Sequence, residues 1–242
     1  MPVVHLRLII PAPARATKKP LLSGARAGKI ARVGTEPQGS MARQADVVFH
    51  LHAHLPYLLG HGTWPHGSVW LYEAAVEVYL PLLARLRGLA ERGVPLRLSL
   101  GLTPTLIEQL TDPRFESGLR EYLRGHAAAA AADARYFETV GEGAPAGLAR
   151  RWEAELSGLL EHFDRLGGSL VSGFLALADD GCVEFSASAA THGYLPLLGS
   201  QEAVARQVGI GLLAHRRHLG AWSGGFWLPE CAYRPGREWR RP

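Results

Sequence analysis

Apolar and polar positions recur with two periods along residues 41–242, and these periods mark a succession of strands and helices. Period-two alternation predicts strands over about 46–54 and 94–102, and shorter β-rich runs predict strands over about 182–188 and 221–228. Apolar residues three and four positions apart predict helices over about 70–92, 104–140, 146–166, 168–178 and 201–218. Strands that alternate with helices indicate β/α units around a largely parallel sheet.

The predicted elements form four strand-and-helix units. A sheet closes into a barrel only when its strands remove both of its edges, and four units do not close one. We therefore expect an α/β fold that is part of a barrel. Pro81 lies within the predicted helix 70–92, where it should kink or split the helix because it has no backbone N–H.

Charge divides the chain into two parts. The sequence pI is about 9.3, but residues 1–40 contain seven Lys or Arg and one Glu, whereas the rest contains 19 basic and 21 acidic residues. The body therefore has no basic patch of the kind that binds nucleic acid. Because residues 1–40 lack apolar periodicity, we expect an unstructured leader, with Met41 as the native start. A targeting peptide and a basic binding tail are the alternatives.

No apolar stretch is long enough to span a bilayer, and nothing near the start has the pattern of a secretion signal. We therefore expect a soluble, cytoplasmic protein without a membrane partner. In that compartment Cys182 and Cys231 should be reduced thiols. Residues 234–242 follow the last predicted strand without another element to pack on it, so the chain looks cut off.

Three histidines alternate with apolar residues on the first predicted strand. His50, His52 and His54 share one face because side chains alternate along a strand. In β/α barrels the working residues lie at the carboxyl ends of strands. The three imidazoles therefore indicate a functional face, which could bind either sugar hydroxyls or a metal ion.

Two further residues lie on or after the third predicted strand. Glu184 is in an apolar setting, where an ionised carboxylate needs a hydrogen bond or a charged partner. An internal ion pair and a role near substrate are both open for Glu184. His192 follows in a turn at the exit of the strand, which favours a functional role.

The fourth predicted strand ends next to an acid and two aromatic residues. Pro229 ends the ladder because it lacks a donor, and this places Glu230 at the mouth of the barrel. Trp227 and Tyr233 offer faces on which sugar rings stack. A surface acid without a role is the alternative for Glu230.

Three segments in this order resemble the first three motif regions of glycoside hydrolase family 57, and its 1,4-α-glucan branching enzymes in particular. They are residues 52–57 (HAHLPY), Glu184 with residues 190–196 (ATHGYLP), and residues 227–233 (WLPECAY). The resemblance covers about residues 45–236. It implies a distorted (β/α)7 TIM-like barrel, of which residues 41–242 form the N-terminal portion, incomplete at the C-terminus.

The resemblance also implies roles for individual residues. Glu230 corresponds to the nucleophile of a retaining α-glucan-active enzyme, and His52, His54, His192 and Trp227 correspond to residues around the donor sugar. The family's aspartate acid/base belongs to a fourth motif that would lie beyond Pro242, so we expect the 242-residue chain to be inactive alone. The implied partner is an α-glucan such as amylose or glycogen, and no cofactor or metal ion is implied.

Other functions fit parts of the pattern. Hydrolysis or 4-α-glucanotransfer is possible within the same family. A zinc-dependent polysaccharide deacetylase would use the face of His50, His52 and His54 as metal ligands, but it ordinarily needs an aspartate-rich first strand, and only Asp46 is nearby. A glucan-binding fragment without catalysis is the third alternative.

Overall fold

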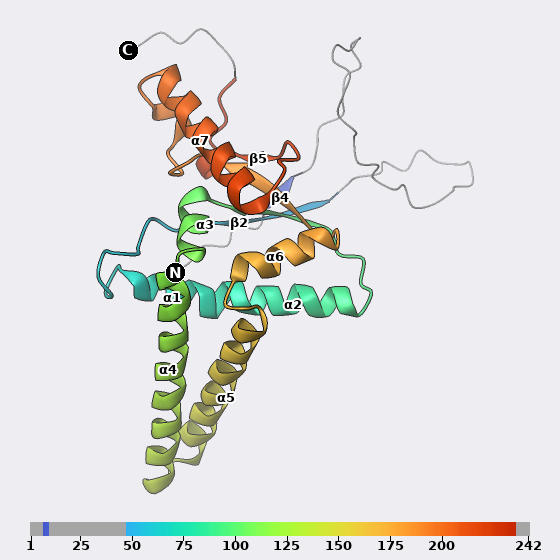
Figure 1. Cartoon of the computed structure of the whole chain (residues 1–242). Helices are drawn as coiled ribbons and strands as arrows, with labels where there is room; N and C mark the ends of the chain where they lie inside the picture. Colours follow the sequence, from blue (N-terminus) through green and yellow to red (C-terminus); the bar gives the residue numbers. More distant parts are fainter. Residues whose placement is uncertain (1–6, 10–46, 236–242) are drawn as a thin grey trace, which may run out of the picture.

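The computed structural model describes residues 7–9 and 47–235, and these form a helix-covered sheet (Figure 1). The strands are β1 (Arg7–Ile9), β2 (Val48–Ala53), β3 (Leu98–Leu102), β4 (Val183–Ser188) and β5 (Phe226–Trp227). They are ordered β1-β2-β3-β4-β5, with β1 antiparallel to β2 and the other neighbours parallel. The predicted class is confirmed as an α/β fold with a curled, largely parallel sheet, whereas seven strands stay a prediction.

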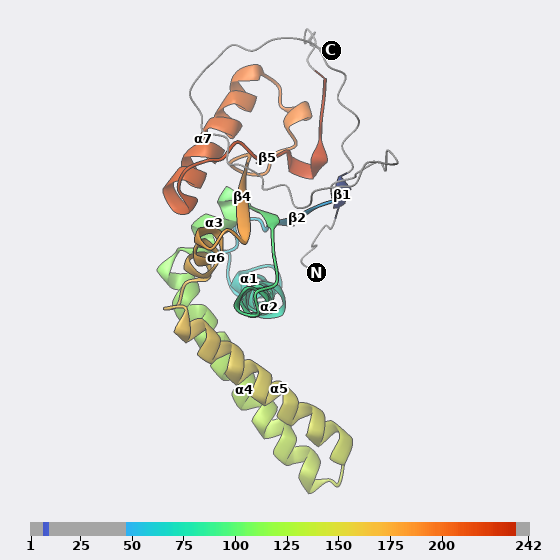
Figure 2. The same ribbon diagram turned by 90° about the vertical axis from the view of Figure 1, so that its right-hand side faces the viewer.

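Helices connect the parallel strands. They are α1 (Ser68–Ala74), α2 (Leu80–Glu91), α3 (Pro104–Leu110), α4 (Pro113–Thr139), α5 (Gly143–Arg165), α6 (Leu170–Asp179) and α7 (Gln201–Leu219). In Figures 1 and 2, α2 and α6 lie below the strands, and α7 lies above β4 and β5. These bounds agree with the predicted helices to within a few residues.

The helix predicted over residues 70–92 is divided in front of Pro81. A π-helical turn, Ala75–Tyr79, separates α1 from α2, and the N–H of Leu80 donates to the carbonyl of Ala75, five residues back. Pro81 then occupies the first turn of α2, where its missing N–H costs no hydrogen bond. The predicted split of this helix is therefore confirmed.

The two ends of the sheet differ from the predicted pattern of elements. Within the segment expected to be an unstructured leader, Arg7–Ile9 pair with Val48–His50 as an edge strand, while residues 1–6, 10–46 and 236–242 lie outside the described residues, so the leader stays a prediction. The strand predicted over 221–228 shrinks to Phe226–Trp227. Before β5 the chain turns, because Gly224 has a φ of 108° and the indole N–H of Trp222 donates to the Gly225 carbonyl at 2.8 Å.

The hydrophobic core lies between β3, β4 and the helices below them. Its fully buried side chains include Leu71, Leu80, Leu100, Leu102 and Phe174. Cys182 is buried at the start of β4 and Cys231 is half-buried, and both are free thiols as predicted. No helix in the described part of the chain is long and apolar enough to cross a membrane.

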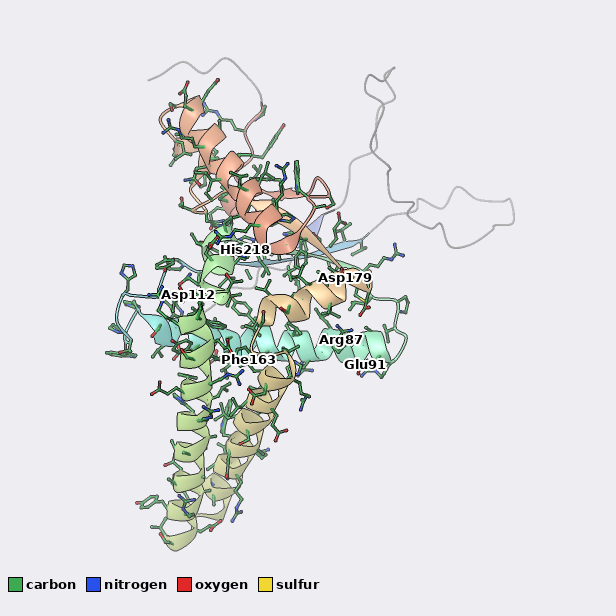
Figure 3. All side chains as sticks on the ribbon, viewed as in Figure 1. Arg87, Glu91, Asp112, Phe163, Asp179 and His218 are labelled. Carbon is green, nitrogen blue, oxygen red and sulfur yellow. The ribbon has the colours of Figure 1, made fainter. Side chains whose placement is uncertain are left out.

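Helices α4 and α5 form a long antiparallel hairpin that projects away from the sheet (Figure 2). Phe163 lies at its base (Figure 3). The Phe163 side chain is fully buried against Phe115, and the guanidinium of Arg120 lies 5.2 Å from the Phe163 ring centre. Arg120 also forms ion pairs with Glu116 and Asp164, which joins the two helices.

Candidate functional site

The predicted face of histidines exists along β2. His50 and His52 are each 6% exposed, and His54 follows the last residue of the strand. Their apolar neighbours Leu51 and Ala53 pack against the core on the opposite side. The alternation of side chains therefore places the three imidazoles on one face of the sheet, as predicted.

Four imidazoles and one indole form what we call the histidine–tryptophan stack: His50, His52, His54, His192 and Trp227. His50 and Trp227 are nearly parallel, with ring centres 4.4 Å apart and an interplanar angle of 9°. His52 contacts both Trp227 at 5.1 Å and His192 at 4.8 Å. His54 stacks on His192 at 4.1 Å. The stack joins residues from β2, from the loop after β4 and from β5.

Hydroxyl groups on β3 and directly after it fix two of these imidazoles. Nδ1 of His50 lies 2.9 Å from Oγ of Ser99, and Nδ1 of His54 lies 3.1 Å from Oγ1 of Thr103. Ser99 pairs with His50 in the parallel register of β2 and β3. Neighbouring strands therefore supply both the ring and the group that orients it.

Ser188, the last residue of β4, contacts two further members of the stack, His192 and Trp227. Its hydroxyl donates to the carbonyl of Trp227 at 3.0 Å and lies 3.4 Å from Nδ1 of His192. Nε2 of His192 lies 3.3 Å from Nε2 of His52. One buried serine thus connects the backbone of β5 to the histidines of the stack.

Helix α7 holds the loop that presents His192. The carbonyl of Gln207 accepts from the N–H of Ala190 at 2.9 Å, and its side-chain amide bonds both the N–H and the hydroxyl of Thr191 at 3.0 and 2.8 Å. Close packing of α7 on the end of β4 depends on Gly211, because a Cβ there would overlap the carbonyl of Ser188. The position of His192 therefore depends on α7.

Glu230 lies at the carboxyl end of β5 in a short 3-10 turn, Pro229–Cys231. Its φ of 54° and that of Cys231, 56°, are left-handed values, which non-glycine residues rarely adopt. The side chain is 62% exposed, and Oε1 lies 3.5 Å from Nε2 of the buried His192. This geometry places an accessible carboxylate beside the stack, at the edge of the sheet where the parallel strands end.

Burial disfavours the charged form of three histidines in the stack. Burial lowers the pKa of His192 to about 4, and the neighbouring His54 adds to the shift. Burial also lowers the pKa of His50 and of His54, and for His54 the negative charge of Glu230 acts in the opposite direction. His192 is therefore neutral near pH 7, and its contact with Glu230 at that pH is not an ion pair.

Two expected site residues lie outside the stack. Glu184 is exposed near the start of β4, and its Oε1 accepts a hydrogen bond from Ser223 at 2.8 Å. The internal ion pair considered for Glu184 is not found among the described residues. Tyr233 is 76% exposed and borders a hollow of about 370 Å³ with Leu195 and Leu228. The structure brings neither side chain into ring or hydrogen-bond contact with the stack.

Sequence reasoning missed the hydroxyls of Ser99, Thr103 and Ser188. A signal was present, because residues 99, 101 and 103 alternate with leucines, much as the histidines of residues 50–54 alternate with apolar residues. The pairing of β2 with β3 was needed to show that these hydroxyls face the imidazoles.

The imidazoles of the stack are not arranged as a set of metal ligands among the described residues. Rings that stack face to face direct their nitrogen lone pairs along separate planes, and no group of three or more His, Cys, Asp or Glu in the described part of the chain has metal-binding geometry. The chemistry of the site is instead that of a carboxylate beside aromatic faces, a combination suited to sugar rings.

The family profile described as glycosyl hydrolase family 57 matches residues 48–237. This range contains all the strands of the parallel sheet and every residue of the site. The chain belongs to glycosyl hydrolase family 57, which confirms the resemblance inferred from the motifs.

Similar proteins include known α-glucan enzymes. The chain is 37% identical over 203 residues to the 1,4-alpha-glucan branching enzyme TK1436 of Thermococcus kodakarensis, covering 81% of this chain and 28% of that protein. It is 35% identical over 204 residues to a probable 1,4-alpha-glucan branching enzyme of Mycobacterium tuberculosis, with coverages of 78% and 38%. The chain thus spans about a third of the length of these relatives.

Solved structures agree in fold. A branching enzyme of the family from Pyrococcus horikoshii matches with a TM-score of 0.72 and 38% identity, over 77% of this chain and 34% of that one. The alpha-amylase AmyC of Thermotoga maritima matches with a TM-score of 0.71 and 26% identity, over 77% and 36%. Both activities thus occur on this architecture.

Proposed function

We propose that this chain carries the nucleophile-bearing part of a retaining α-glucan-processing catalytic domain, with 1,4-α-glucan branching as its reaction. One observation supports this most directly: Glu230 is exposed at the carboxyl end of β5, 3.5 Å from buried His192, beside the faces of the histidine–tryptophan stack. The similarity to branching enzymes supports the choice of reaction within the family.

In the proposed reaction a carboxylate oxygen of Glu230 attacks the anomeric carbon of an α-1,4-linked glucosyl unit. The bond to the leaving 4-oxygen breaks, and that oxygen takes a proton from a second carboxyl group. The 6-hydroxyl of another glucan then attacks the glucosyl–Glu230 ester, returns its proton to the second carboxyl group and forms an α-1,6 branch. Two displacements retain the anomeric configuration.

The stack has two roles in this proposal. The indole of Trp227 offers a face for the apolar side of a sugar ring, and His54 and His192 offer ring nitrogens to its hydroxyls. Because burial lowers the pKa of His192 to about 4, its ring is neutral and does not form a tight ion pair with the attacking carboxylate. Glu184 and Tyr233 lie outside the stack, and we place them in contact with more distant glucose units.

Mechanism-based labelling tests the nucleophile without requiring the second carboxyl group. In 5-fluoro-α-glucosyl fluoride the leaving fluoride needs no protonation, so Glu230 alone should form a stable glycosyl ester that intact-mass and peptide mass spectrometry detect. Glu230→Gln should abolish the label, whereas the matched Glu184→Gln should retain it. Labelling that persists in Glu230→Gln would overturn the assignment.

We also propose that residues 1–242 alone do not branch amylose. The family resemblance assigns the acid/base to a motif that these residues do not contain, and such catalysis contributes about 10²- to 10⁴-fold. Iodine staining of amylose should therefore stay constant with the purified polypeptide. A normal loss of stain would contradict this expectation.

A glucan-binding role without catalysis is the second candidate, because Trp227 presents an aromatic face independently of any nucleophile. Affinity electrophoresis in amylose separates the two functions. Retardation that is lost in Trp227→Ala but kept in Glu230→Gln, together with an absence of covalent labelling, would favour binding alone.

A further inference from the structure

A segment without regular secondary structure follows β2, and its first residue is His54 of the histidine–tryptophan stack. Residues 54–59 run from the stack into the core, where the side chains of Leu55, Leu58 and Leu59 are no more than 4% exposed. Buried backbone N–H and C=O groups almost always have hydrogen-bond partners, because leaving one without a partner is costly. Outside a helix or strand, such partners come from other parts of the chain.

One side chain of α3 bonds this segment at three points. Oε1 of Gln109 accepts from the N–H of Leu58 at 2.6 Å and from the N–H of Leu59 at 3.2 Å. Nε2 of Gln109 donates to the carbonyl of Pro56 at 2.9 Å. It also donates to the carbonyl of Thr105, four residues earlier in α3, at 2.9 Å. Gln109 therefore joins the segment after β2 to α3.

The side-chain amide of Gln109 uses its full hydrogen-bonding capacity. A carboxamide has two acceptor sites on its oxygen and two N–H donors, and fully buried Gln109 uses all four. An ionised glutamate at this position would lack the donors, a methionine would lack nearly all of the bonds, and an asparagine would be shorter. The pattern of bonds is therefore specific to glutamine.

His54 lies between two fixed parts of the backbone. Before it, the N–H of Thr103 donates to the carbonyl of Ala53 at 3.1 Å, beside the last paired residues of β2 and β3. After it, Gln109 bonds the chain from Pro56 onward. The direction in which the His54 ring points thus depends on α3 as well as on the sheet.

We propose that Gln109 is a positioning residue for the reaction: its amide holds the backbone after His54 and so keeps the His54 ring against His192, beside Glu230. The inference rests on the proposed function, in which His54 offers a ring nitrogen to a hydroxyl of the bound sugar. His54 stacks on His192 at 4.1 Å, so a displaced His54 would disturb the ring that contacts the carboxylate. A misplacement of about 1 Å in such a site can cost about 100-fold in rate.

Packing of the leucines is the competing explanation for the position of this segment. Burial of Leu55, Leu58 and Leu59 stabilises the segment, but hydrophobic burial is not directional and does not by itself fix where the backbone lies along the core. Hydrogen bonds have preferred distances and angles. The two explanations differ in what happens when the amide of Gln109 is removed and the leucines stay.

Gln109→Met makes this change, because it keeps the length of the side chain and removes the amide. The half-saturating concentration of 5-fluoro-α-glucosyl fluoride should rise several-fold, and by up to about 100-fold, in the covalent labelling of Glu230. The maximal labelling rate should change less, because His54 contacts the sugar whereas Glu230 attacks it. The ¹⁵N resonances of the His54 ring should shift in the same variant.

Leu123→Ala is the control for lost stability. Leu123 is fully buried in α4, so its truncation should lower the melting temperature, yet it should leave the half-saturating concentration and the His54 resonances unchanged. Labelling is measured at a temperature at which both variants are folded. Equal effects of Gln109→Met and Leu123→Ala on labelling, or no effect of Gln109→Met on the His54 ring, would overturn the proposal.

Hydrogen exchange of the unaltered chain gives a test that needs no variant. The backbone amides of Leu58 and Leu59 and the side-chain amide of Gln109 should exchange slowly, since each is buried and bonded. Rapid exchange at these three groups would overturn the proposal even if Gln109→Met does not fold. If the unaltered chain takes no label, the proposed function fails, whereas unchanged His54 resonances in Gln109→Met refute the positioning role itself.

Discussion

Backbone strain at the residue scale is concentrated at the site. His192, Glu230 and Cys231 are the non-glycine residues of the described part of the chain that have positive φ, at 56°, 54° and 56°. Each such conformation costs on the order of 1–3 kcal/mol and persists only when surrounding contacts fix it. Here the contacts are those of Gln207 with the loop before His192, and Pro229 before Glu230. The strained backbone thus includes His192 and Glu230, whose side-chain atoms Nε2 and Oε1 lie 3.5 Å apart.

The depressed pKa of His192 makes folding sensitive to acid. The folded pKa, about 4, lies below the unfolded value of about 6.5, so the unfolded chain binds the proton first as the pH falls. The contribution to stability is therefore complete above pH 6.5 and is lost as the pH falls toward 4, with an upper limit of about 3 kcal/mol. We expect the free energy of unfolding, measured with urea, to decline over this range.

Substitution of His192 isolates its part in that decline. His192→Asn removes the titrating ring and keeps a residue that tolerates the left-handed backbone, so the pH dependence should be shallower. The matched change His61→Asn alters an exposed histidine outside the stack and should leave the slope as it is. Equal slopes in all three proteins would refute the link between stability and His192.

The contact between α7 and β4 depends on a single glycine in α7. Gly211 faces the carbonyl of Ser188, so Gly211→Ala should force α7 away from β4 and lower the free energy of unfolding by about 2–3 kcal/mol. Gly209, two residues earlier, is exposed with nothing near its missing Cβ. Gly209→Ala should therefore raise stability by about 0.5 kcal/mol through helix propensity.

Position 211 also tests how α7 supports the site. Because the loop before His192 bonds Gln207, Gly211→Ala should weaken the covalent labelling of Glu230 as well as stability. Urea unfolding and the labelling rate would be measured together for both glycine variants. A Gly211→Ala protein as stable and as readily labelled as Gly209→Ala would show that α7 does not position this loop.

Periodicity predicted most elements because it reflects which face of each element is buried. The alternation around His50 and His52 placed both on one face, and the apolar spacing of residues 70–92 located the helix that Pro81 divides. The strand over 221–228 was too long because its glycines permit a turn that the apolar pattern does not reveal. The local pattern of apolar residues thus predicted where an element lies better than it predicted the residues at which the element begins and ends.

Periodicity of apolar residues does not predict contacts between segments that are distant in the sequence. The stack joins His50 to Trp227 across 177 positions, and the sequence offered no measure of their separation. Glu184 was expected within the barrel, yet its side chain is exposed and accepts a hydrogen bond from Ser223 in the turn before β5. The family motifs supplied the order of the site residues, whereas strand register supplied their hydroxyl partners.

At the scale of the whole molecule, the last strand exposes an edge. Among the described strands, β5 pairs only with β4, so its other side presents unpaired backbone groups. Such an edge is a template for pairing with a second chain. The start of β2 adds exposed Val48 and Phe49, each almost half accessible. Both features should promote self-association of the 242-residue polypeptide.

Sedimentation velocity over a range of concentrations tests this edge. We expect the weight-average mass to rise with concentration, and Phe226→Lys to reduce the rise because a charged side chain opposes pairing at an edge. Leu148→Lys is the control, since it removes an exposed apolar side chain from α5 without touching a strand. If both variants reduce association equally, general hydrophobicity drives it. A monomer at every concentration with one cooperative melt would show that the edge of β5 is already protected.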